Sequence, residues 1–87
     1  MVQRRVKIKN KTGLHAKFAC YLAKRAMKFD CKIEIIKGSS RANAKSIMGL
    51  MSLGLAYSTE ILLKAEGERA EEAIEDISLL IESGFEE

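Results

Sequence analysis

Three segments of the chain alternate between apolar and polar residues, which is the pattern of a β-strand with one face buried and one face in water. They are residues 2–9, 31–37 and 60–66. Because each expected strand has a polar face, helices can cover only one side of the sheet that the strands form. Arg4 interrupts the apolar face of the first segment. The apolar positions are Val2, Val6, Ile8, Cys31, Ile33, Ile35, Ile61, Leu63 and Ala65.

Two longer segments, residues 16–29 and 69–82, repeat apolar residues with the spacing of an amphipathic helix. Glu71 and Glu72 lie in the first turn of the second helix, where the helix dipole favours acidic side chains. Gly84 is the expected stop of that helix. The residues expected to face the core are Phe18, Ala19, Leu22, Ala23 and Ala26 in the first helix and Ala70, Ala73, Ile74, Ile77, Leu80 and Ile81 in the second.

A shorter helix is expected at residues 47–53, with Ser46 as its N-cap and Gly54 as its stop, and a short strand is expected at residues 40–43. The order of elements is therefore β-α-β-β-α-β-α. It predicts an α+β fold, a two-layer open-faced β-sandwich with its helices on one face of the sheet and water on the other. The whole chain, residues 1–87, is expected to form one domain.

Composition narrows the class of protein. The chain is 47% hydrophobic and 31% charged, as in a soluble globular protein, and its net charge of +3 is too small to argue for direct nucleic-acid binding. No apolar run approaches the roughly 20 residues of a membrane span, so no membrane insertion is expected. Cys20 and Cys31 lack metal-ligand spacing, which favours free thiols in a reducing cytoplasm. Neither a metal nor a cofactor is expected.

His15, the only histidine, lies where a turn formed by residues 10–13 gives way to the first expected helix. At a helix start the first backbone N–H groups lack helical partners and the dipole is positive, so that end attracts phosphate. A neutral imidazole ring is also a nucleophile near neutral pH. The pattern suggests a histidine that carries a phosphoryl group, and an ordinary surface or capping histidine is the alternative.

Ser46 begins the shorter helix, where its hydroxyl is expected to accept a backbone N–H and to contribute about 1 kcal/mol. The capping box is incomplete because Gly49 stands where Glu or Gln is needed. Ile47, Met48 and Met51 share a face of this helix and form either a docking surface or part of the core. On the first helix, the residues opposite the core stripe are Ala16, Cys20, Lys24 and Met27.

Two stretches carry a family resemblance. Residues 10–16 read Asn-Lys-Thr-Gly-Leu-His-Ala, and residues 43–54 read Asn-Ala-Lys-Ser-Ile-Met-Gly-Leu-Met-Ser-Leu-Gly. They resemble the two signatures of HPr, the histidine-containing phosphocarrier family of the bacterial phosphoenolpyruvate:sugar phosphotransferase system. The resemblance covers essentially the whole chain, with the same order of elements. Residues 45–48, Lys-Ser-Ile-Met, are similar to the Gram-positive form, in which a dedicated kinase phosphorylates the serine.

The resemblance implies a four-stranded antiparallel sheet in the order 1-4-2-3 and a carrier that is itself no enzyme. His15 would accept a phosphoryl group on Nδ1 from enzyme I, which is charged by phosphoenolpyruvate, and pass it to the IIA component of a sugar permease. Lys17 would stabilise the phosphate together with the backbone of Ala16, Lys17 and Phe18. The implied partner-binding residues are Ala16, Cys20, Lys24, Ile47, Met48 and Met51.

The resemblance also implies a regulatory site at Ser46. An HPr serine kinase/phosphorylase would phosphorylate this residue and turn the protein toward a catabolite-control transcription regulator. The protein is expected to be a cytoplasmic monomer that serves sugar transport and carbon catabolite repression.

Two departures from the family pattern lie next to the histidine, because the family usually has Arg-Pro where this chain has Lys17 and Phe18. Lysine keeps the positive charge but loses the planar fork with which arginine grips two phosphate oxygens. Phe18 restores a backbone N–H that proline lacks, within the first turn of the helix. These changes leave the carrier role in place and bear on the rate of transfer.

Two other classes of function fit parts of the pattern. A regulatory relative of HPr acts only through phospho-Ser46, and its known form lacks the histidine that this chain has. A sheet-surface RNA binder shares a similar order of elements but stacks bases on strand aromatics. The aromatic residues here all fall outside the expected strands: Phe18, Tyr21, Phe29, Tyr57 and Phe85. We therefore favour the phosphocarrier.

Overall fold

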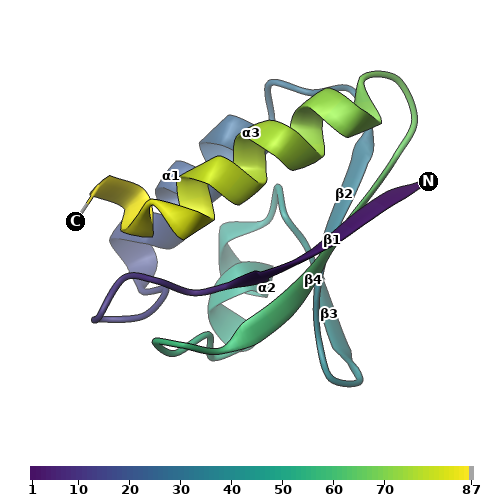
Figure 1. Cartoon of the computed structure of the whole chain (residues 1–87). Helices are drawn as coiled ribbons and strands as arrows, with labels where there is room; N and C mark the ends of the chain where they lie inside the picture. Colours follow the sequence, from purple (N-terminus) through teal and green to yellow (C-terminus); the bar gives the residue numbers. More distant parts are fainter. Residues whose placement is uncertain (87) are drawn as a thin grey trace.

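The computed structural model describes residues 1–86, so that of the expected domain 1–87 only Glu87 lies outside the described residues. The elements follow the expected order β-α-β-β-α-β-α, with a short 3₁₀ turn at the end (Figure 1). The strands are β1 (Val2–Lys7), β2 (Lys32–Lys37), β3 (Ser40–Asn43) and β4 (Glu60–Glu66). The helices are α1 (Ala16–Ala26), α2 (Ile47–Ser52) and α3 (Ala70–Glu82), and the 3₁₀ turn is η1 (Gly84–Glu86).

The four strands form one antiparallel sheet in the order β1-β4-β2-β3. β4 is an inner strand, and its Leu63 lies opposite Arg4 of β1 and Ile35 of β2. The three helices lie on one side of the sheet (Figure 1). The expected open-faced sandwich and the strand order 1-4-2-3 are both confirmed.

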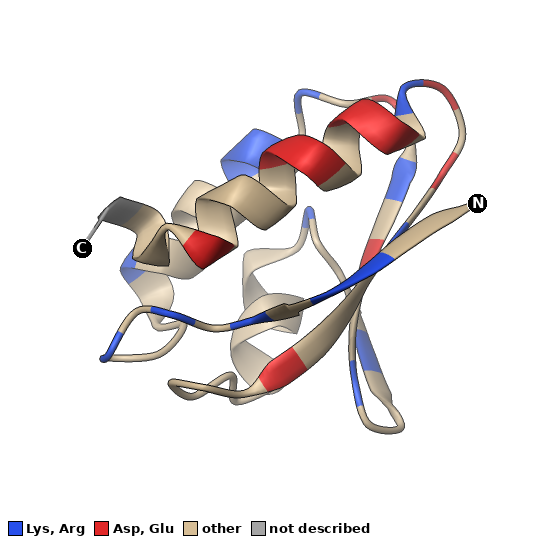
Figure 2. Ribbon diagram, viewed as in Figure 1, with Lys and Arg blue, Asp and Glu red and all other residues tan. Residues whose placement is uncertain are grey.

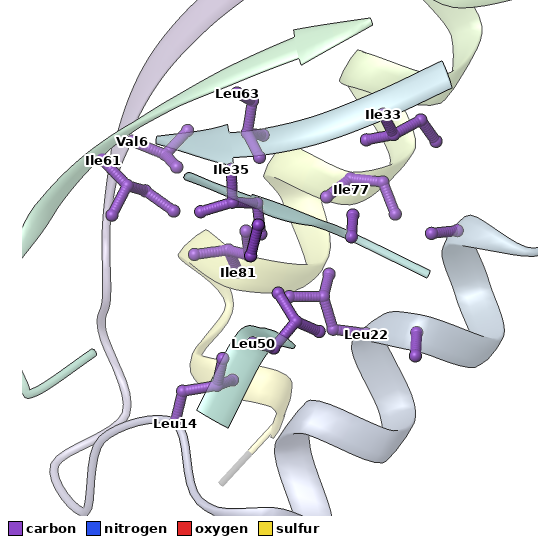
Figure 3. Packing of buried hydrophobic residues seen from close by; sticks show 14 of the residues in the cluster. Val6, Leu14, Leu22, Ile33, Ile35, Leu50, Ile61, Leu63, Ile77 and Ile81 are labelled. Carbon is purple, nitrogen blue, oxygen red and sulfur yellow. The ribbon is translucent and has the colours of Figure 1, made fainter. Parts of the chain in front are cut away.

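The hydrophobic core lies between the helices and the covered face of the sheet. Nearly all apolar positions expected from the strand and helix patterns are buried there, and only Val2 and Leu80 remain half-buried at its edge. Figure 3 shows Leu22 of α1 and Leu50 of α2 within this core, with Ile81 of α3 close by. Both periodicities in the sequence therefore identified the faces that pack together.

Arg4, which interrupts the apolar face of β1, is explained by a polar partner on α3. Its guanidinium donates a 2.8 Å hydrogen bond to the hydroxyl of Ser78 and a 3.2 Å bond to the carboxylate of Glu75. Ser78 is fully buried and donates in turn to the carbonyl of Glu75. The apolar pattern did not identify Ser78 as a core position, because a serine is buried only when such partners are available.

Two elements are shorter by two or three residues than the sequence pattern predicted, and β2, α2 and α3 are each shorter by one residue. β1 ends at Lys7 rather than at residue 9, because β4 begins only at Glu60 and Ser58 before it has a left-handed backbone with φ of 72°. α1 ends at Ala26 rather than at residue 29, because the next N–H groups fold back onto nearer carbonyls. Phe29 N–H donates to the carbonyl of Ala26 over 3.1 Å, and this turn carries the Phe29 ring into the core.

α3 begins one residue later than expected, because Arg69 is its N-cap and has a left-handed backbone with φ of 60°. The Arg69 guanidinium donates bonds of 2.8 and 3.1 Å to the carboxylate of Glu72 and lies 4.9 Å from the centre of the Phe29 ring. The hydrogen bond and the positive charge of Arg69 lower the pKa of the Glu72 carboxyl. Side-chain contacts therefore hold a backbone conformation that non-glycine residues rarely adopt.

Cys20, which is half-buried, and Cys31, which is buried, are free thiols, as their spacing predicted. Figure 2 shows that acidic residues gather along α3 and in the turn before it, while the loop after β1 is basic. Within residues 1–86, no helix combines the length and the apolar character that a membrane crossing requires.

Candidate functional site

The loop before His15 is held by one backbone hydrogen bond to a second loop at residues 55–57 and by bonds within the loop itself. Leu14 N–H donates a 2.7 Å bond to the carbonyl of Leu55, and Gly13 N–H donates a 3.0 Å bond to the carbonyl of Asn10. The side-chain amide of Asn10 donates to the carbonyl of Gly13. Gly13 has φ of +76°, and a Cβ there would lie 2.9 Å from the Leu55 oxygen, so the turn needs glycine. This close approach fixes the position at which α1 begins.

His15 is the exposed N-cap of α1, as the turn before it predicted. Its backbone is extended, and its carbonyl accepts a 2.8 Å bond from Ala19 N–H, the first bond of the helix. The N–H groups of Ala16, Lys17 and Phe18 precede that bond and therefore have no helical partner. The imidazole makes no capping bond to any of them. A nucleophilic ring and a positive helix end thus lie together at the surface.

One concave surface extends from His15 along the outside of α1 toward α3. This groove, of about 750 Å³, brings together four of the predicted site residues: His15, Lys17, Phe18 and Lys24. Its remaining lining residues, which sequence analysis did not assign to the site, are Tyr21, Arg25, Lys28, Leu80 and Phe85. The other predicted residues do not line it; they are Ala16, Cys20, Ser46, Ile47, Met48 and Met51.

Among the residues that the structure describes, the lining of the groove carries four cations and no carboxylate. Arg25 is paired with Asp76 of α3 over 2.8 Å, which ties the two helices together. Lys24 follows Lys17 by seven residues, and Lys28 follows Lys24 by four. This spacing places the three lysines on one side of α1. This spacing was visible in the sequence. The contribution of Phe85 was not, because only the folded chain end brings it beside α1.

Ser46 is the N-cap of α2, as predicted. Its hydroxyl accepts a 3.0 Å hydrogen bond from Gly49 N–H, and its carbonyl accepts the bond of Leu50 N–H. A Cβ at Gly49 would lie 3.1 Å from the Ser46 hydroxyl oxygen, which is a tight contact. Glycine at position 49 therefore leaves the capping box incomplete but avoids crowding the Ser46 hydroxyl. Ser46 is half-buried, and its hydroxyl lies at the positive end of a short helix.

Three apolar side chains of α2 lie outside the core. Ile47 is 41% exposed, Met48 84% and Met51 44%, while Leu50 alone of this helix is fully buried. The alternative that these three residues fill the core is therefore wrong. α2 packs against α1, on which Ala16 and Lys24 are exposed and Cys20 is half-buried. We call the predicted partner-binding set Ala16, Cys20, Lys24, Ile47, Met48 and Met51 the docking surface.

Comparison with known proteins identifies one family. Residues 2–83 match a family model described as the PTS HPr component phosphorylation site. The chain is 40% identical over 82 residues to the HPr-like protein Crh of Bacillus subtilis, which covers 94% of this chain and 96% of that protein. It is 37% identical over 87 residues to the phosphocarrier protein HPr of Treponema pallidum, which covers 100% of this chain and 99% of that one.

Solved structures agree with this result. HPr-C-His from Thermoanaerobacter tengcongensis is 47% identical to this chain and superposes with a TM-score of 0.96, over 100% of this chain and 98% of that one. An HPr dimer from the same organism, also 47% identical and with full coverage of both chains, superposes with a TM-score of 0.80. Because a dimer occurs among these relatives, the monomeric state expected from the sequence stays a prediction.

The cap at Ser46 can be measured directly. Ser46→Ala removes the hydroxyl that accepts the Gly49 N–H, so we expect it to lower the free energy of unfolding by about 1 kcal/mol. Denaturant titration measures this change. Ser52→Ala, at the other end of α2, is the control: its hydroxyl only donates to a carbonyl that is exposed to water, so its loss should change stability by less than about 0.5 kcal/mol. Equal effects of the two substitutions would show that Ser46 is not a cap.

Proposed function

This chain belongs to the HPr family of phosphocarrier proteins, and we propose that His15 accepts a phosphoryl group on Nδ1 from enzyme I and passes it to the IIA component of a sugar permease. The observation that carries the proposal is the exposed His15 ring at the start of α1, beside N–H groups without helical partners. A carrier must present its nucleophile to two partners in turn, and an exposed N-cap meets that requirement.

The transfer exchanges one bond to phosphorus for another. The lone pair on Nδ1 forms the new N–P bond while the bond between phosphorus and the donor breaks. The charge in the transition state is spread over three equatorial oxygens. The N–H groups of Ala16, Lys17 and Phe18 are positioned to donate to those oxygens, and the ammonium of Lys17 adds positive charge. The partners would supply the remaining catalytic groups, so the protein acts as substrate and carrier.

The docking surface supports the same proposal. Its α2 part is apolar and exposed, which is typical of a surface that a partner covers. Methionine side chains are flexible and adapt to different partners, so Met48 and Met51 suit a protein that binds enzyme I and a IIA component in alternation. Lys24, at the edge of this surface and in the groove, would contact acidic groups of either partner.

Regulation through Ser46 is a second candidate, favoured by the similarity to Crh and by the N-cap position of this serine. Phosphorylation by an HPr serine kinase/phosphorylase would place the phosphate at the start of α2, and the modified protein would bind a catabolite-control transcription regulator in the cytoplasm. A regulator that acts through Ser46 alone has no use for an exposed His15. The two roles together therefore account for more of the structure than regulation alone.

The carrier role predicts a defined product. Incubation with phosphoenolpyruvate and enzyme I should place one acid-labile phosphate on the protein, because phosphohistidine hydrolyses in acid and phosphoserine does not. Mass spectrometry before and after acid treatment measures it. His15→Ala should abolish the product, while Ser46→Ala should retain it. A parent protein that gains no acid-labile phosphate contradicts the carrier proposal.

The charge of Lys17 should control the rate. Lys17→Arg should transfer at least as fast as the parent, because guanidinium can contact two phosphate oxygens at once. Lys17→Glu should slow phosphorylation of His15 by about tenfold or more, since it replaces an attraction with a repulsion next to the acceptor. Lys32→Glu, which makes the same charge change at an exposed position of β2, is the control for net charge. Equal rates for the two glutamate variants would exclude a role for Lys17.

A negative charge at Ser46 should weaken docking without unfolding the domain. The helix start favours an anion, so Ser46→Asp should leave the melting temperature nearly unchanged. The charge lies next to Ile47, and burying it against a partner costs solvation, so the KM for enzyme I should rise by about tenfold. Ser40→Asp on exposed β3 is the matched control. If both aspartate variants have the KM of the parent, the docking surface lies elsewhere.

A further inference from the structure

We propose that Phe18 is a positioning residue for His15, and that its ring, supported by Phe85, holds the imidazole in the orientation from which it accepts a phosphoryl group. This inference rests on the proposed role of His15 as acceptor. It concerns the buried side chain of Phe18, which packs against the His15 ring. This role differs from those given above to the Phe18 backbone and to the docking surface.

The contact between the two rings is close. Their centroids are 4.7 Å apart and their planes are tilted by 57°. Both values lie in the range of favourable aromatic pairs. His15 is exposed and its side chain makes no capping hydrogen bond, so ring packing is what restricts its rotation. A pair of this kind shifts an orientational equilibrium by roughly two- to tenfold.

Phe18 can act as a support because its own ring is fixed. It is only 5% exposed, and it stacks on Phe85 with centroids 5.1 Å apart and an interplanar angle of 29°. Tyr21 packs against its edge, with centroids 6.1 Å apart. Phe18 is also a core-facing residue in the first turn of α1, one helical turn from the N-cap. The orientation of His15 is therefore linked to the packing of the domain.

The stack of Phe85 on Phe18 depends on an uncommon backbone conformation at residues 84 and 85. Gly84 and Phe85 both have left-handed backbones, with φ of 68° and 58°. For Phe85 this conformation is unfavourable, because a Cβ crowds the backbone there. The two residues turn the chain after α3 back toward α1, and the Phe85 side chain is 5% exposed in the resulting position. The burial of its ring against Phe18 offsets the backbone strain.

The same ring also contacts the neighbouring cation. Nζ of Lys17 lies 5.7 Å from the centroid of the Phe18 ring, within the distance at which a cation is attracted to an aromatic face. The buried Phe18 side chain thus borders both the His15 ring and the ammonium group of Lys17. Transfer requires the reacting atoms to be aligned at about 3 to 3.5 Å, so a loss of order in these two groups should slow the chemical step.

Phe18→Leu tests the inference, because leucine keeps an apolar side chain in the core and removes the ring. We expect the kcat of enzyme I with this variant as phosphoryl acceptor to fall about tenfold, with KM within about twofold of the parent. A buried residue that does not contact the partner should affect kcat rather than KM. Phe18→Tyr retains the ring and should restore most of the rate. Phe29→Leu is the matched control: Phe29 is equally buried, beyond the C-terminal end of α1, and does not line the groove.

The ring contact has its own readout in the unphosphorylated protein. The carbon-bound ring protons of His15 should show ring-current shifts and cross-relaxation with the Phe18 ring in NMR spectra of the parent, and Phe18→Leu should abolish both. Phe85→Leu leaves α1 intact and should weaken them in part, with a smaller fall in kcat. This variant keeps the test decisive if Phe18→Leu does not fold.

The outcomes separate this inference from the proposed function. One outcome is that the parent accepts a phosphoryl group while enzyme I shows the same kcat with Phe18→Leu as with the parent. In that case the positioning role is wrong and the carrier role stands. If Phe18→Leu does not fold, the same comparison is made with Phe85→Leu. A fall in kcat of the same size in Phe29→Leu would also overturn the positioning role, because it would show a general effect of a disturbed core. If the parent accepts no phosphoryl group, the carrier proposal itself fails.

Discussion

The burial of one face of a four-stranded sheet is the constraint on which the rest of this structure depends. Only that face is apolar, so α1, α2 and α3 all pack on it and leave the other face in water (Figure 1). Side chains such as Leu22 and Leu50 fix the helices against the sheet (Figure 3). The N-terminal ends of α1 and α2 stay at the surface, where His15 and Ser46 are their N-caps.

Hydrogen bonds between loops, together with the buried side chain of Leu14, set the position of the proposed acceptor. The bond from Leu14 N–H to the carbonyl of Leu55 joins two loops, and Gly13 permits their close approach. The N–H groups at the start of α1 belong to the backbone and do not depend on side-chain identity. The proposed phosphate-binding geometry would come from the helix start, so it does not require particular side chains at Lys17 and Phe18.

The side chains on α1 determine the charge and the packing around His15. Lys17, Lys24 and Lys28 make one side of α1 basic, while acidic residues gather along α3 (Figure 2). Phe18 belongs to both the core and the site, since it is buried in the first turn of α1 and contacts the His15 ring. A substitution of Phe18 therefore alters the packing of the exposed His15 ring directly, because the two rings are in contact.

The sequence by itself determined the strand and helix faces and the caps at His15 and Ser46, because these follow from local periodicity and from short-range hydrogen bonding. It left open whether Met48 was exposed. It did not determine where α1 ends, why Arg4 is tolerated on an apolar face, or that Phe85 lies beside Phe18. The end of α1 is a local turn from which the Phe29 ring enters the core. The last two depend on partners far along the chain: Ser78 accepts from Arg4, and Phe85 contacts Phe18 because α3 packs beside α1. Contacts between distant segments leave no periodic pattern, so only the tertiary structure decided them.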